Sequence, residues 1–256
     1  MNIAVLNVNP PEQPMSANFK PFEMAKLSPD RRGNRILNFT AKSLIVWQSN
    51  AKFMNTIHEQ FGDIDIYLFD QILKGRFTPG MKILDAGCGG GRNIIYFLRE
   101  GYEVFGVDAS TESIAYVRRL MHHLAPKLPL ENFQLAEVDK VVFGEEKFDV
   151  VISSAVLHFA NDEEHFMRML NGMWQQLKPG GMFFARLASN IGIEDLVQEI
   201  EGRRSIAPDG SEYFLVDQEF LLALNEQLSA ELIEPIKTTN VQNLRCMTTW
   251  VIRKKA

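Results

Sequence analysis

The sequence has few of the features that mark special classes of protein. Its 256 residues include only two cysteines, Cys88 and Cys246, which indicate no disulfide framework. No apolar run approaches the roughly 20 residues that span a bilayer, and the N-terminus lacks the basic and apolar regions of a signal peptide. Positive charge is not in excess, because 27 Lys and Arg stand against 32 Asp and Glu. We therefore expect a globular cytoplasmic protein that has no nucleic-acid partner and no membrane span.

Proline is concentrated near the N-terminus, where five of the eleven prolines fall within residues 1–34. This composition predicts a Pro-rich N-terminal extension without regular structure over residues 1–42. The remaining chain, residues 43–256, is predicted to form one domain. It begins with helices over residues 43–75, and an insertion over residues 189–216 is expected to act as a lid above the site.

From residue 81 onward, short apolar runs alternate with segments of helical period. Strands are expected at 81–85, 103–107, 132–136, 148–153, 182–188, 231–239 and 244–253. Helices are expected at 91–100, 111–124, 162–177 with Asn161 as its N-cap, 193–201 and 216–228. This alternation predicts an α/β fold in which helices cover both faces of a mostly parallel sheet. The hairpin return at the end of the chain favours an antiparallel last strand.

The most informative stretch joins the first of these strands to a helix and reads Asp85-Ala86-Gly87-Cys88-Gly89-Gly90-Gly91-Arg92-Asn93. Glycines at such a junction allow left-handed backbone angles and the close approach of a ligand. A dinucleotide fingerprint would need a third glycine where Arg92 stands, and a P-loop would need a lysine that is absent. Asp85 instead suits a cationic group, and Asp108 at the end of the next strand suits the two hydroxyls of a ribose. The pattern indicates a nucleoside that has no phosphate and carries a positively charged amino-acid tail.

Five motifs in order resemble those of the class I S-adenosylmethionine-dependent methyltransferases, and most closely the small-molecule group with tellurite-resistance and ubiquinone-biosynthesis enzymes. They are Asp85–Gly91, Gly106–Ser110, Ala136-Glu137, Phe148–Ser153 and Leu177–Gly181. Ala136-Glu137 departs from the usual Gly-Asp. The resemblance implies a Rossmann-like three-layer sandwich with strand order 3-2-1-4-5-7-6, S-adenosylmethionine as cofactor, S-adenosylhomocysteine as product and no metal. The implied cofactor-binding residues are Asp85, Ala86, Gly87, Cys88, Gly89, Arg92, Asn93, Asp108, Ala109, Ser110, Ala136, Glu137, Val138 and Ser153.

The methyl acceptor is expected to be a small molecule, because the segment after the fourth strand lacks the signatures of DNA-base and catechol methylation. His158 in this segment is a candidate general base or acceptor-orienting group; alternatively, it holds the loop by a local hydrogen bond. Arg186 is a candidate for binding an anionic acceptor together with Arg203 or Arg204, unless these are solvated surface residues. His58 and His165 are expected to be surface or helix-packing residues.

Two other classes of function remain open at this point. One is an oxidoreductase with a nucleotide cofactor, which Asp85 and Arg92 both disfavour. The other is a cofactor-binding regulatory protein of the same fold that has no turnover.

Overall fold

The structure is a computed structural model that describes residues 26–29, 35–38 and 57–255. The chain separates into two units, residues 1–54 and 55–256, which we describe individually. In the first unit, β1 (Lys26–Pro29) and β2 (Arg35–Asn38) form an antiparallel pair. This hairpin corrects the expectation that residues 1–42 have no regular structure. The rest of that extension and most of the helix expected from residue 43 lie outside the described residues.

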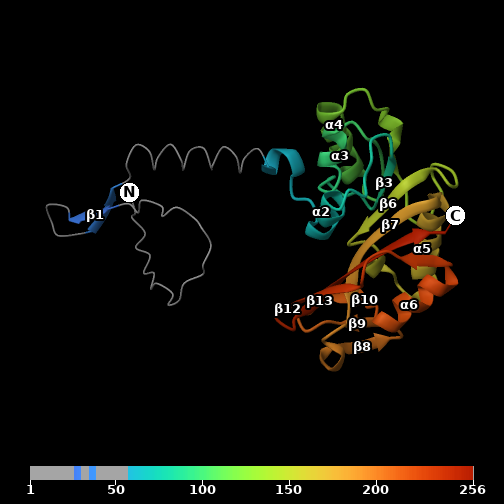
Figure 1. The fold of residues 1–256 in the computed structure, drawn as a ribbon. Coiled ribbons are helices and arrows are strands. Elements are labelled where there is room, and N and C mark those ends of the chain that lie inside the picture. Colours follow the sequence, from blue (N-terminus) through green and yellow to red (C-terminus); the bar gives the residue numbers. More distant parts are fainter. Residues whose placement is uncertain (1–25, 30–34, 39–56, 256) are drawn as a thin grey trace. The chain divides into compact units, whose positions relative to one another are not determined.

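The second unit is built around a twisted sheet (Figure 1) that has eight strands in the described part of the chain. The strands are β3 (Lys82–Ala86), β4 (Glu103–Asp108), β5 (Phe133–Leu135), β6 (Phe148–Ser154), β7 (Leu177–Ser189), β11 (Ala230–Leu232), β12 (Lys237–Val241) and β13 (Arg245–Lys254). Their order is β11-β13-β7-β6-β3-β4-β5, and β12 also pairs with β13. Strands β3 to β7 pair in parallel, whereas β13 runs antiparallel to β7. The expected order 3-2-1-4-5-7-6 is confirmed, with the sixth position shared by β11 and β12.

Helices cover both faces of this sheet and give the expected three layers (Figure 1). They are α2 (Ile66–Leu73), α3 (Ile95–Arg99), α4 (Thr111–Leu124), α5 (Glu163–Gln176) and α6 (Gln218–Gln227). Alternate residues of a strand enter different cores: Ile152 joins the core beneath α2, α3 and α4, and Val151 joins the core beneath α5 and α6. Both side chains are fully buried, as the near-continuous apolar strands predict.

Several elements differ from their predicted bounds for local reasons. Helix α3 begins at Ile95 rather than Gly91, because Gly91 has a left-handed φ of +76° and remains in the turn. Helix α5 is capped by Asp162, which accepts from the backbone N–H of His165 at 2.6 Å, and not by Asn161. The single strand expected at 231–239 is divided into β11 and β12. The break falls at Glu234-Pro235, where proline has no N–H to donate.

The helix expected at 193–201 was a wrong prediction. The segment contains a short 3₁₀ turn, Glu194–Leu196, followed by β8 (Gln198–Glu201). With β9 (Arg204–Ile206) and β10 (Glu212–Phe214), β8 forms a separate antiparallel sheet of three strands. The segment Pro208-Asp209-Gly210 lies in the turn that joins β9 to β10, which pair in antiparallel. Pairing with β9 therefore overrode the helical propensity of the segment.

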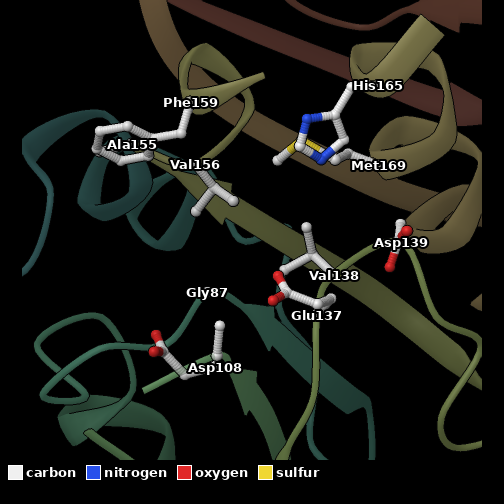
Figure 2. A pocket seen from close by; sticks show the side chains of 11 residues that line it. Gly87, Asp108, Glu137, Val138, Asp139, Ala155, Val156, Phe159, His165 and Met169 are labelled. Atoms are coloured by element: carbon white, nitrogen blue, oxygen red, sulfur yellow. The ribbon is translucent and has the colours of Figure 1, made fainter. Parts of the chain in front are cut away.

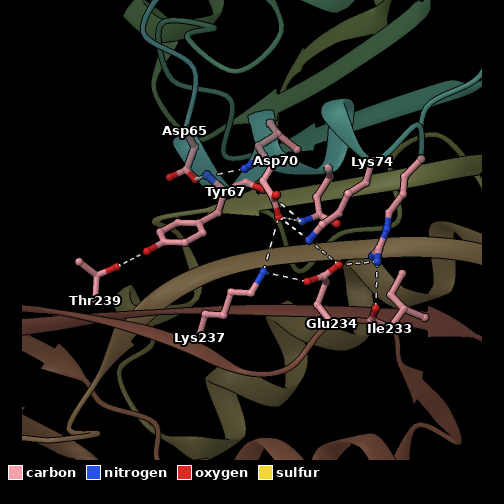
Figure 3. Close-up of polar contacts among 11 residues, drawn as sticks. Asp65, Tyr67, Asp70, Lys74, Ile233, Glu234, Lys237 and Thr239 are labelled. Atoms are coloured by element: carbon pink, nitrogen blue, oxygen red, sulfur yellow. Dashed lines mark hydrogen bonds and ion pairs between the residues drawn. The ribbon is translucent and has the colours of Figure 1, made fainter. Parts of the chain in front are cut away.

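Helix α2 is fastened to the C-terminal strands by polar side chains (Figure 3). Glu234, only 7% exposed, accepts hydrogen bonds from the ammonium groups of Lys74 and Lys237, each at 2.8 Å. Arg76 also pairs with this carboxylate, and Asp70 pairs with Lys74 at 2.7 Å. Burial disfavours the ionised form of Glu234, but Lys237 and Lys74 outweigh it and lower its pKa to about 2. The cluster ties the end of α2 to the segment between β11 and β12.

Candidate functional site

The candidate site begins with the turn after β3. The backbone N–H groups of Gly87 and Cys88 both donate to the carbonyl of Val107, at 2.8 and 2.9 Å. Gly87 has a φ of +76°, and a Cβ there would lie 2.5 Å from a methyl group of Val156. A Cβ on Gly89 would meet nothing within 4 Å. The first glycine is therefore required by backbone angle and packing, whereas the second leaves open space beside the turn.

Asp108 ends β4 beside this turn and has both carboxylate oxygens oriented by backbone groups. Its Oδ2 accepts from the N–H of Gly89 at 2.8 Å, and its Oδ1 accepts from the N–H of Ser110 at 2.9 Å. Each oxygen keeps a further lone pair for another donor. Ser110 in turn caps α4 by accepting from the N–H of Ser113. The carboxylate is thus held in one orientation at the end of its strand, as the sequence requires of a ribose-binding group.

Asp85, which precedes the last residue of β3, is buried. It is 2% exposed, and its Oδ2 has no hydrogen-bond partner among the residues that the structure describes. Burial raises the pKa of Asp85 to about 7; the Arg92 guanidinium opposes this rise and the Asp108 carboxylate adds to it. A buried carboxylate of this kind has an unmet demand for a donor or a cation.

A cavity of about 510 Å³ opens beside the turn (Figure 2). Five of the predicted cofactor-binding residues line it, together with six residues that the sequence analysis did not assign to the site. The five predicted residues are Gly87, Asp108, Ala109, Glu137 and Val138. The six additional residues are Asp139, Ala155, Val156, Phe159, His165 and Met169. Their signal in the sequence is weak. Ala155 and Val156 follow β6 directly, and His165 and Met169 are four residues apart on α5, hence on one helix face.

Other predicted cofactor-binding residues are placed around this cavity without lining it. Ala86 and Cys88 are buried behind the turn, and burial raises the pKa of the Cys88 thiol. Ala136 donates its N–H to the carbonyl of Asp108 at 3.1 Å. Ser153 is 1% exposed, and its hydroxyl has no hydrogen-bond partner within the described part of the chain. Like Asp85, Ser153 presents an unsatisfied polar atom at the carboxyl end of the parallel strands.

Arg92 and Asn93 connect the glycine turn to α2. The guanidinium of Arg92 donates to the Ser154 hydroxyl at 3.2 Å and lies 3.8 Å from the carboxylate of Asp65. Asn93 accepts from the N–H of Asp65 at 3.0 Å. Asp65 itself caps α2 and has a fully buried side chain. The start of α2 is therefore tied to the turn that follows β3.

His158 is buried, with 4% exposure, and is not among the residues that line the cavity. Its Nδ1 accepts from the N–H of Ala188 at 3.2 Å, and its ring packs against Tyr213 with centroids 4.6 Å apart. Burial lowers the pKa of His158 to about 4. These contacts describe a side chain that ties the turn after β6 to the end of β7. A general-base role for His158 stays a prediction.

Arg186 is engaged within the protein. Its guanidinium donates to the buried carboxylate of Asp65 at 2.7 Å and lies over the ring of Tyr67 at 5.2 Å. Arg203 is paired with Asp217 at 2.7 Å, and Arg204 is paired with Glu212. Each of the three arginines considered for an anionic acceptor therefore already has a carboxylate partner. The role of Arg186 in acceptor binding stays a prediction, and its pairing with Asp65 weakens it.

No group of three or more His, Cys, Asp or Glu side chains in the described part of the chain is arranged to hold a metal ion. Among the helices described, none combines the length and the apolar character needed to cross a membrane.

Comparisons with known proteins agree with this site. Residues 84–185 match the family model described as methyltransferase domain. The chain is similar to an uncharacterized methyltransferase of Synechocystis sp., with 31% identity over 41% of this chain and 46% of that protein. It is also similar to the ubiquinone biosynthesis O-methyltransferase of Sinorhizobium medicae, with 32% identity over 57% of this chain and 59% of that protein. The chain thus spans about half the length of the curated relatives that it matches.

The fold is similar to that of a solved methyltransferase. The 1,6-didemethyltoxoflavin-N1-methyltransferase of Burkholderia thailandensis, solved with its substrate and S-adenosylhomocysteine, superimposes with a TM-score of 0.57 at 18% identity. The superposition covers 86% of this chain and 92% of that one. Residues 84–185 thus match a methyltransferase domain, and the fold agrees with the resemblance of the motifs to the class I S-adenosylmethionine-dependent methyltransferases. The Burkholderia enzyme was solved with S-adenosylhomocysteine, which agrees with the predicted cofactor, S-adenosylmethionine.

Proposed function

We propose that this protein transfers the methyl group of S-adenosylmethionine to a small-molecule acceptor and leaves S-adenosylhomocysteine. The observation that carries the proposal is the pair of carboxylates on either side of the glycine turn. Asp108 lines a cavity with both oxygens oriented by backbone N–H groups. Asp85 is buried, and one of its oxygens has no partner among the described residues. A dinucleotide would place a pyrophosphate at this turn, where the two carboxylates would repel it.

The residues present fit the cofactor. Asp108 would accept hydrogen bonds from the ribose hydroxyls, and Asp85 would face the ammonium of the amino-acid tail. Buried apolar walls at Val138 and Met169 would exclude water from the cavity. When bound, the cofactor supplies an electrophilic methyl group on a sulfonium, so that no metal or activating side chain is required for the leaving group.

The contribution of the chain to the reaction would then be mainly positioning. Aligning an acceptor with the methyl group can lower a barrier by about 7–11 kcal/mol. Helix α2 is the element that we assign to this task, since Asp65 joins it to the glycine turn and the Glu234 cluster joins it to the C-terminal strands. A buried His158 with its pKa lowered to about 4 is a weak base at neutral pH, and we assign it a positioning role on the turn after β6.

The names of the relatives indicate which acceptors to test first. Phenols are one class, from the ubiquinone biosynthesis O-methyltransferases, and nitrogen heterocycles are the other, from the toxoflavin N1-methyltransferase. The experiment incubates the full chain with S-adenosylmethionine and each acceptor and measures the release of S-adenosylhomocysteine. Asp108→Ala serves as the matched inactive control.

Three outcomes have distinct meanings. Acceptor-dependent release that Asp108→Ala abolishes supports the proposal. Binding of S-adenosylmethionine with no release across both classes would favour the regulatory alternative. If S-adenosylmethionine does not bind at all, the proposed function is wrong.

A further inference from the structure

His165 lies on the wall of the cavity that faces Glu137 and Val138 (Figure 2). It belongs to the first turn of α5, where its own backbone N–H donates to the cap residue Asp162 at 2.6 Å. Its position in the cavity differs from the surface or helix-packing role that the sequence suggests. A histidine held at the rim of a ligand cavity is a candidate for reading the polar edge of that ligand.

The hydrogen bonds of His165 determine which nitrogen is free. Its Nδ1 accepts from the backbone N–H of Asn161 at 3.1 Å. An imidazole nitrogen that accepts a hydrogen bond carries no proton, so the proton of the neutral ring resides on Nε2. Nε2 has no partner in the described part of the chain, and it is directed toward the side of the cavity where Val138 and Glu137 lie (Figure 2). His165 therefore offers one N–H donor to a bound molecule.

The positions of the two carboxylates define which part of a nucleoside would reach this donor. Asp85, which suits the cationic tail, does not line the cavity, whereas Asp108, which suits the ribose, does. If the cationic tail of the ligand lies at Asp85 and its ribose lies at Asp108, the base is the part that remains. The base would then lie between Glu137 and His165. The walls there are apolar, because Val138 and Met169 are 8% and 5% exposed, which suits the faces of a planar base.

The polar groups around this position match one base in particular. Adenine has ring nitrogens that accept hydrogen bonds and an amino group that donates them. His165 supplies a donor, and the carboxylates of Glu137 and Asp139 supply acceptors. Oδ1 of Asp139 is buried and has no hydrogen-bond partner in residues 57–255 or in the two described strands that precede them. A base with a carbonyl in place of the amino group would place its oxygen near carboxylates and be disfavoured.

We infer that His165 donates from Nε2 to a ring nitrogen of adenine and so contributes to selecting an adenine nucleoside. The inference rests on the proposed function, since it takes S-adenosylmethionine as the ligand. It assigns a specificity-determining role to a residue outside the glycine turn and both strand-end carboxylates.

Two substitutions distinguish the contributions of Nδ1 and Nε2 of His165. His165→Asn retains an oxygen close to the position of Nδ1 and so keeps the bond to Asn161, but it removes the donor at Nε2. His165→Gln retains a donor close to Nε2 and loses the acceptor at Nδ1. Titration calorimetry with S-adenosylhomocysteine should give a threefold to tenfold weaker Kd for His165→Asn, the effect of about one hydrogen bond, and a nearly unchanged Kd for His165→Gln. His123→Asn, on the exposed last turn of α4, is the control and should bind normally.

A second measurement uses the unaltered protein and changes the ligand. The 1-deaza, 3-deaza and 7-deaza analogues of S-adenosylhomocysteine each replace one ring nitrogen with C–H. One of them should bind the wild-type protein threefold to tenfold more weakly than the parent, and His165→Asn should add no further loss for that analogue. If His165→Asn instead weakens the binding of all three analogues by the same factor as it weakens the binding of the parent compound, the inference is overturned.

The outcomes distinguish this inference from the proposed function. If wild-type protein binds S-adenosylhomocysteine and all three analogues equally, His165 does not read a ring nitrogen, and the inference alone fails. If His165→Gln weakens binding as much as His165→Asn, the residue acts through the start of α5 and not through its Nε2 donor. If the wild-type protein does not bind S-adenosylhomocysteine, the proposed function fails first.

Discussion

The buried carboxylate of Asp85 makes the affinity for the cofactor dependent on pH. Its pKa is raised from 3.8 to about 7, mainly by burial. A difference of about three pKa units corresponds to about 4 kcal/mol of added cost for ionising this group in the empty protein. An ammonium placed against the carboxylate favours its ionised form and moves the pKa back down. Binding of S-adenosylhomocysteine should therefore release up to about one proton below pH 7.

Calorimetry measures both consequences. Between pH 7 and pH 5.5 the affinity for S-adenosylhomocysteine should fall by about tenfold per pH unit, because protonated Asp85 must lose its proton on binding. Titrations at pH 6.5 in two buffers of different ionisation enthalpy report the released proton directly. Asp85→Asn should bind more weakly at pH 8 and lose this pH dependence. An affinity that stays constant from pH 5.5 to pH 8, with no proton released, would refute the assignment of Asp85 to the cationic tail.

The same pKa shift predicts a cost in stability. An acid whose pKa is raised on folding binds more protons in the folded state, so the free energy of unfolding contributed by Asp85 falls as pH rises from about 4 to 7. Asp85→Asn should therefore be more stable than the wild-type protein at pH 8, and this advantage should disappear at pH 4. Urea denaturation at the two pH values measures the difference. Equal effects at both pH values would contradict the raised pKa.

Three further predictions concern the site and its anchoring. Asp108→Ala should weaken the binding of S-adenosylhomocysteine at least tenfold, since it removes two charge-assisted bonds of on the order of 1.5–3 kcal/mol each; an unchanged Kd in calorimetry would mean that the ribose lies elsewhere. Gly87→Ala should lower both stability and affinity, because φ is +76° and the new Cβ would lie 2.5 Å from Val156; normal thermal melting and binding would contradict this. Glu234→Gln should cost about 2–3 kcal/mol and lower Tm by about 5–10 °C. The pKa of Glu234 is lowered to about 2, so its stabilising contribution is present above pH 4.5 and is lost as the pH falls toward 2. The wild-type protein and Glu234→Gln should therefore converge in stability at pH 2. A constant difference in stability would count against the ionic cluster.

The sequence predicts most of the sheet because each buried strand is a near-continuous apolar run ending in a polar residue. β4 and β6 lie within one residue of their predicted bounds, and α4 matches at both ends. These elements are determined locally, by Asp108 at one strand end and by Ser110 as a helix cap. The failures involve long-range competition. β8 is exposed throughout and exists because β9 is beside it, which no local pattern in residues 193–201 reveals.

The candidate site likewise contains residues that the sequence predicts and residues that only the fold brings together. Gly87 and Asp108 carry a signal in the sequence because glycine spacing and strand-end acids are local features. His165 and Met169 carry almost none, since a helix face that lines a cavity has the same period as one that packs in the core. The pairing of Arg186 with Asp65, separated by 121 residues, is likewise a product of topology. The sequence alone therefore could not show that Arg186, a candidate for binding an anionic acceptor, already has a carboxylate partner.

Titration calorimetry of the full chain with S-adenosylhomocysteine and, separately, with NAD at pH 8 decides whether the glycine turn binds a methyl donor or a dinucleotide. This pH lies above the pKa of Asp85, which is about 7, so that its carboxylate is mostly ionised. One molecule of S-adenosylhomocysteine per chain is expected to bind with micromolar affinity, and NAD is expected to give no measurable heat. Micromolar binding of NAD without binding of S-adenosylhomocysteine would contradict the account.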